Sequence, residues 1–173
     1  GIWATHFIAM LSYDPVVPVG YEPLLTAVSL AIAIVTTTVG FAIASVGGPH
    51  LVLSRLVGGL VVGLGISAMH FTGMSAIRVP GIISWHMDIV IAAILMGALF
   101  GMASLYLAKT AQTNQQKLLG KANLTIAVAT MHFGAMGALV ITPDPTVPVP
   151  AQLISQEYLA VGVAVVAIGL IAI

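Results

Sequence analysis

The sequence has no cysteine in 173 residues, which excludes disulfides and thiolate metal sites. Charge is also scarce: only 6% of the residues are charged, whereas soluble domains carry about a quarter. With 60% hydrophobic residues, this composition excludes a soluble domain. No signal peptide is visible. No nucleophile–base pair or phosphate-binding loop is visible either, so we do not expect this chain to be an enzyme. We also expect no nucleic-acid partner.

Long apolar runs are what the sequence has instead. An apolar helix of about 20 residues spans a bilayer, and continuous runs exclude the alternating pattern of barrel strands. The sequence therefore predicts an all-α, polytopic transmembrane helical bundle with the lipid bilayer as its partner. Six apolar segments are expected, at residues 1–11, 23–46, 51–77, 88–108, 119–141 and 158–173. Since the first and last begin or stop inside an apolar run, we interpret residues 1–173 as one domain and a fragment truncated at both ends.

The connectors alternate between two kinds, so the chain reads as a repeated two-helix unit. Proline-rich connectors follow the first, third and fifth segments, and every acid lies in or beside them: Asp14, Glu22, Asp88, Asp144 and Glu157. Apart from Arg78, the bases lie at the other helix ends: Arg55, Lys109, Lys117 and Lys121. Because short loops rich in Lys and Arg stay cytoplasmic, we expect the proline-rich ends to face outward.

One motif, His-Phe-x-x-Met, occurs three times. Its histidines are His6, His70 and His132, spaced 64 and then 62 residues apart. Residues i and i+4 share a helix face, which pairs these histidines with Met10, Met74 and Met136. Met69 and Met131, which precede two of the histidines, are offset by about 100° and reach the same centre only from the side.

The three histidines are expected in the outer half of the membrane at matched depth. An ionisable group there usually faces a polar cavity, so three at one depth predict a shared cavity. Imidazole and thioether ligands suit copper, especially Cu(I), better than magnesium or calcium. A packing role stays open, because a duplicated scaffold copies packing residues as well as ligands. Three residues are weaker candidates: Trp3 for lining the cavity, Thr72 for orienting an imidazole and His86 as an outer metal-uptake ligand. His50 reads as a loop residue.

These copies resemble the MHYT sensor domains of bacterial membrane proteins, which are named for a Met-His-Tyr-Thr motif near the outer ends of membrane helices. The flanks Gly1-Ile2-Trp3 and residues 63–68 also look like that family. The matching positions are His6, His70, His132, Met69 and Met131, together with Met10, Met74 and Met136. The sequence departs from the family in having Phe7, Phe71 and Phe133 in place of tyrosine, and Thr5 in place of the first methionine.

The resemblance implies a sensory input module in the bacterial inner membrane, with its motif ends on the periplasmic side. It implies copper bound by Met and His, a diatomic gas such as O2, CO or NO as the signal, and a cytoplasmic cyclic-di-GMP output domain in the same protein. A second copy of the chain is a further candidate partner, as a homodimer. Three alternatives remain open. The first is haem binding through two axial ligands, which we rank below copper binding. The other two are copper transport and a structural membrane anchor.

Overall fold

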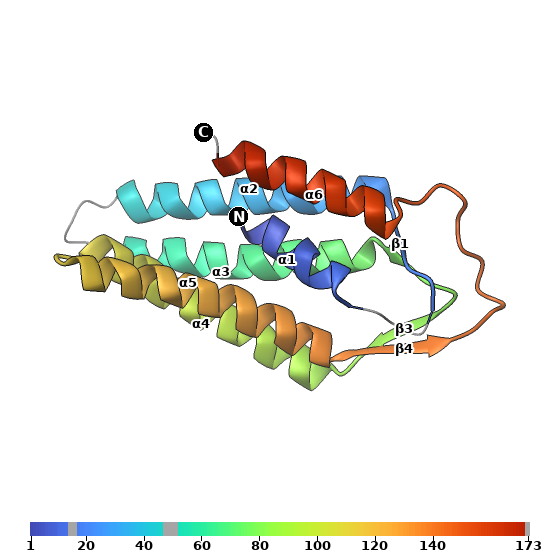
Figure 1. Ribbon diagram of the computed structural model, residues 1–173. Helices are drawn as coiled ribbons and strands as arrows, with labels where there is room; N and C mark the ends of the chain where they lie inside the picture. The colour runs from blue at the N-terminus through green and yellow to red at the C-terminus, as the bar shows by residue number, and fades with distance from the viewer. Residues whose placement is uncertain (14–16, 47–51, 172–173) are drawn as a thin grey trace.

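The chain folds into a helical bundle that is closed at one end by short β-strands (Figure 1). This computed structural model describes residues 1–13, 17–46 and 52–171, so Asp14 and His50 lie outside the described residues. Its helices are α1 (Ile2–Leu11), α2 (Pro23–Val46), α3 (Val52–Ser75), α4 (Met87–Thr110), α5 (Asn114–Gly137) and α6 (Gln156–Ile171). The prediction of an all-α bundle of six helices is confirmed for this part of the chain.

The helices alternate in direction, as the two-helix repeat predicts. The motif helices α1, α3 and α5 all run toward the strands, and α2, α4 and α6 run away from them (Figure 1). Helix α3 packs between α2 and α4, α4 packs on α5, and α6 packs on α1. Helices α2, α4 and α6 thus pack on α3, α5 and α1, respectively, and α4 also packs on α3, the motif helix that it follows.

Glycines bring α3 and α4 close together. A Cβ atom on Gly59 would lie 2.5 Å from the carbonyl oxygen of Gly101, and one on Gly63 would lie 2.5 Å from that of Gly97. No real Cβ fits at such a distance, so the small residues allow the two backbones to touch. This close approach fixes α3 relative to the α4–α5 pair.

The outer surface of the bundle is apolar. By length and composition, α2, α3 and α4 are each able to cross a membrane, and α1 and α6 are shorter apolar helices. Helix α5 is equally long but carries Lys117 and Lys121 near its start. Large apolar side chains such as Leu24, Leu95 and Val165 are exposed on these helices. A surface of this kind suits lipid rather than water.

The proline-rich connectors are joined to one another by backbone hydrogen bonds. Strand β1 (Gly20–Tyr21) pairs with β2 (Ile77–Arg78), and β3 (Gly81–Trp85) pairs with β4 (Leu139–Pro143), both antiparallel. An isolated bridge joins Tyr21 to Ile154, so the third connector is tied to the first. We call these joined connectors the cap. It holds the ends of α1, α3 and α5 at one level.

Several boundaries predicted from apolar runs were wrong. The fifth segment was expected to stay helical to Ile141, but α5 ends at Gly137 and Leu139–Pro143 forms β4. Likewise α3 ends at Ser75, before Ile77, which lies in β2. The β-branched residues here continue the apolar run but favour a strand.

At the other end of the bundle, α5 begins earlier than predicted. The expected start was Leu119, within a basic connector. In the structure Thr113 and Gln116 form a capping box, in which each side chain accepts a backbone N–H bond, and the helix starts at Asn114. This pair satisfies backbone donors that would otherwise be free at the helix start.

Candidate metal centre

Three imidazoles from three different helices meet at one point. The Nδ1 atom of His6 on α1 lies 3.1 Å from Nδ1 of His70 on α3 and 3.2 Å from Nδ1 of His132 on α5. The third side of the triangle, from His70 to His132, is 3.3 Å. The ring planes are inclined to one another by 77° to 83°. We call these three residues the His triad.

The three contacts cannot all be hydrogen bonds. A protonated imidazole nitrogen has no lone pair in the ring plane with which to accept a second proton. The three nitrogens are therefore best accommodated when all three lone pairs point at one shared cation. A triangle with sides near 3.2 Å has its centre about 1.8 Å from each corner, and metal–imidazole bonds are about 2.0 Å long. The residues present therefore fit a metal ion that would be held by the three Nδ1 atoms.

The chemistry of the donors also fits a soft or borderline ion. In the part of the chain that the structure describes, the His triad is the cluster able to hold a metal, and no carboxylate belongs to it. His6, His70 and His132 are only 1%, 0% and 5% exposed. Burying a neutral imidazole costs less desolvation free energy than burying a carboxylate, because the imidazole carries no charge.

Aromatic rings surround the triad unevenly. Each histidine contacts the phenylalanine that follows it, edge to face, with ring centroids 4.7 to 5.1 Å apart. Phe7 is fully buried, whereas Phe133 is 66% exposed. The side of the triad formed by His132 is therefore the side nearest the bundle surface.

The outer nitrogens of two imidazoles are enclosed without a partner. Nε2 of His6 and Nε2 of His70 are buried and have no hydrogen-bond partner among the described residues. Thr72 therefore does not orient either of these rings. Gly73 of α3 lies against the outer nitrogen of His6, because a Cβ atom on Gly73 would lie 2.7 Å from Nε2 of His6. Sequence reasoning missed Gly73, although it belongs to the second motif copy.

The methionines are divided between two apolar clusters. Met10, Met69 and Met74 are buried in the cluster that contains Phe7, and the partly buried Met136 packs against it. Met131 belongs to the other cluster, where its Cβ and Cγ would each lie 3.1 Å from a Cβ on Gly97 of α4. The structure thus brings four of the five candidate methionines to the cluster beside His6.

The two remaining candidates are Trp3, which contacts the triad indirectly, and His86, which lies apart from it. Trp3 is buried, and its ring is tilted by 51° to that of Phe7, with centroids 4.8 Å apart. Its Nε1 donates a hydrogen bond to Oγ of Ser29 at 3.0 Å. It supports His6 through Phe7. His86 is exposed at the start of α4 and belongs to no described metal cluster.

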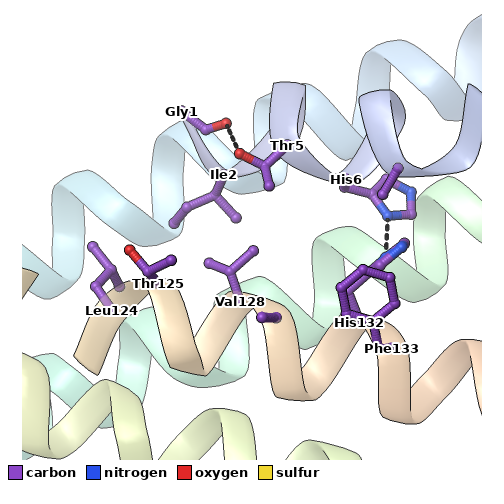
Figure 2. A pocket seen from close by; sticks show the side chains of 11 residues that line it. Gly1, Ile2, Thr5, His6, Leu124, Thr125, Val128, His132 and Phe133 are labelled. Atoms are coloured by element: carbon purple, nitrogen blue, oxygen red, sulfur yellow. Dashed lines mark hydrogen bonds between the residues drawn. The ribbon is translucent and has the colours of Figure 1, made fainter. Parts of the chain in front are cut away.

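A groove leads along α1 and α5 to the triad (Figure 2). Its cavity has a volume of about 280 Å³. Most of the lining is apolar, and His6 and His132 stand at one end of it. The residues that line this α1–α5 groove are Gly1, Ile2, Thr5, His6 and Ala9 from one side, and Leu124, Thr125, Val128, Ala129, His132 and Phe133 from the other.

Comparison with known proteins finds relatives among bacterial signalling proteins. An uncharacterised signalling protein of Caulobacter vibrioides is 38% identical over 94% of this chain and 20% of its own length. The cyclic di-GMP phosphodiesterase NbdA of Pseudomonas aeruginosa is 33% identical over 94% of this chain and 21% of its own. The bifunctional diguanylate cyclase/cyclic di-GMP phosphodiesterase MucR of the same organism is 33% identical over the whole chain and 26% of its own.

The chain thus spans only about a fifth to a quarter of the length of these relatives. No solved structure matches it. The MHYT family, described as the bacterial signalling protein N-terminal repeat, matches residues 1–59 and again residues 63–121. Each match contains one histidine of the triad, and together they cover more than half of the sequence. The chain belongs to the MHYT family of bacterial signalling proteins.

Proposed function

We propose that this chain is a membrane-embedded sensory input domain that binds copper at the His triad and controls a cytoplasmic cyclic-di-GMP output domain. The observation that carries the proposal is the convergence of three buried Nδ1 atoms within 3.3 Å of one another. The output is inferred from the relatives, two of which are named as cyclic-di-GMP enzymes. The charge distribution supports an inner-membrane protein with the cap on the periplasmic side.

The ligand set favours copper over other metals. Imidazole alone suits zinc, copper, iron and nickel, whereas thioethers select Cu(I). Met10 and Met74 lie one helical turn beyond His6 and His70, and both are buried in the same apolar cluster as Phe7, whose ring contacts His6. Copper held by three imidazoles would have a position open to a diatomic gas. The chain itself supplies neutral ligands, an apolar surround and protection from water.

The triad also provides a way to transmit the state of the site. Its members come from α1, α3 and α5. Helices α3 and α5 contact one another much less than they contact α4, and α1 packs mainly on α6. A change in ligation at a metal held there would alter the preferred spacing of the three nitrogens and therefore of the three helices. Because the cap ties the ends of these helices together, relative motion is freer toward the opposite, cytoplasmic end. A ligand that prefers one spacing shifts the population toward it.

Metal titration tests the proposal. We expect the purified protein in nanodiscs to bind copper in a fixed ratio when Cu(I) or Cu(II) is added. Replacing His6, His70 and His132 together by alanine should abolish binding, and His86→Ala should leave it unchanged because His86 is exposed and apart from the triad. Absence of any stoichiometric transition metal in the folded wild-type protein would refute copper binding. In the full-length protein, the triple variant should also lose the ligand response of cyclic-di-GMP turnover.

The geometry disfavours haem. A porphyrin held between two axial imidazoles separates their nitrogens by a flat macrocycle, whereas the three Nδ1 atoms here almost touch. An intense Soret band in the purified protein would overturn this assignment in favour of haem.

A further inference from the structure

We infer that small uncharged molecules reach the His triad sideways from the lipid, through the α1–α5 groove, and not from the external water through the cap. The inference rests on the proposed function, because it gives the route by which a ligand reaches the proposed metal. Figure 2 shows the groove ending at His6 and His132, with Phe133 beside it.

The direct route from the outer side is filled by buried side chains. Met10 and Met74 lie one turn closer to the cap than His6 and His70, and both are buried. Above them, Tyr21 of strand β1 is buried with its ring 6.0 Å from that of Phe7. A ligand entering from the cap would have to displace this cluster.

The histidines differ in their access to the groove. His6 and His132 line it, whereas His70 does not and is fully buried. His132 is the most exposed of the three and lies next to the exposed ring of Phe133. The groove therefore meets the triad at the edge between His6 and His132.

The walls select the chemical class of the ligand. The two hydroxyls in the groove already donate to carbonyls of their own helices, Thr5 to Gly1 at 3.3 Å and Thr125 to Lys121 at 3.2 Å. The other wall residues named above, apart from the two histidines, have apolar side chains or none. A charged or strongly hydrated species would lose its hydration without compensation. A small uncharged molecule that dissolves in hydrocarbon loses little solvation free energy on entering the groove, and it is already concentrated in the lipid.

Dissolved O2 serves as a paramagnetic probe of this route in the metal-free protein. In nanodiscs, with isotope-labelled histidine rings observed by NMR, we expect O2 to enhance relaxation of His132 and His6 several-fold more than that of His70. A water-soluble gadolinium chelate should instead affect His86, which is exposed at the cap end, and none of the triad. Equal O2 effects on His70 and His132, or strong broadening of the triad by the chelate, would overturn the inference.

Filling the groove tests the same route by mutation. Ala129→Phe should reduce the O2 effect on His132 to the level seen for His70, because Ala129 lies in the wall. The matched control is Ala92→Phe on the exposed surface of α4, outside the groove, which should change nothing. If Ala129→Phe lowers helicity, Ala9→Leu fills the groove from the α1 side. An unaltered O2 effect in a folded, filled variant contradicts the inference.

A second readout uses the metal. In the Cu(I)-loaded protein, Ala129→Phe should slow CO binding several-fold without reducing copper content. Ala92→Phe should leave the CO rate unchanged. If the wild type binds no copper while the O2 pattern is as expected, the proposed function fails and the groove remains the route to the triad. If copper binds but the filled groove leaves the CO rate unchanged, only the lateral route fails.

Discussion

Gly73 on α3 and His6 on α1 are so close that no side chain fits between them. A Cβ atom at Gly73 would lie 2.7 Å from Nε2 of His6 and 3.4 Å from Cζ of Phe7. Gly73 is also three residues after His70, so one turn of α3 supplies both an imidazole of the triad and the space for its neighbour. The close approach of α1 to α3 therefore depends on the absence of a side chain at Gly73 as well as on the histidines.

Gly73→Ala should displace the His6 ring and weaken copper binding. Overpacking of this kind usually costs about 1–3 kcal/mol of folding free energy. We expect a lower copper affinity, measured by competition with a chelator, and a lower unfolding temperature. Gly137→Ala is the matched control, because a Cβ there meets nothing within 4 Å and alanine favours the helix. Wild-type copper affinity in Gly73→Ala would show that His6 is not held by this contact.

Much of the site could be predicted from sequence because depth and face follow from counting residues. The positions of His6, His70 and His132 before the proline-rich connectors predicted a meeting point, and the structure brings the three together. Counting could not say which way Met131 points, since a residue beside the histidine on the helix can face either neighbour. It could not identify Gly73 either, because the contact with His6 depends on how closely α1 approaches α3.

The strands escaped prediction for a related reason. Val140 and Ile141 extend the apolar run of α5 without a charge or proline to interrupt it, so composition alone favoured a longer helix. What ends the helix is pairing between connectors distant in sequence: Val140 lies opposite Ser84, and Ile141 opposite Ile83. Such pairing depends on the three-dimensional arrangement of the repeats, which a local pattern does not contain.

Met74 and Met131 should differ in their contribution to the metal site. Met74 is buried in the cluster beside His6, while Met131 packs against Gly97 on α4. We expect Met74→Leu to lower Cu(I) affinity and to remove sulfur scattering from the copper X-ray absorption spectrum. Met131→Leu, which conserves volume, should retain the Cu(I) affinity and the sulfur signal. It should change the free energy of unfolding by less than about 1.5 kcal/mol. Loss of the sulfur signal in Met131→Leu alone would reverse the assignment.

Tyr21 should make the stability of the cap sensitive to alkaline pH. Burial raises the pKa of the Tyr21 phenol to about 12, whereas an unfolded tyrosine titrates near 10. The folded state therefore holds this proton more tightly, and the stabilisation is complete below about pH 10 and is lost as the pH rises toward 12. Unfolding followed between these pH values should show a decline that is smaller in Tyr21→Phe. An identical decline in both proteins would place its origin elsewhere.

The orientation of the bundle is testable because the chain has no native cysteine to interfere. Ala151 is exposed in the third proline-rich connector, and Gln115 is exposed at the start of α5, at the opposite end of the bundle. The excess of Lys and Arg near Gln115 predicts that this end is cytoplasmic. In intact spheroplasts, a membrane-impermeant maleimide should label Ala151→Cys and should label Gln115→Cys only after the membrane is permeabilised. The reverse pattern would place the His triad in the cytoplasmic half of the membrane, next to the output domain, and would contradict the proposed periplasmic location of the site.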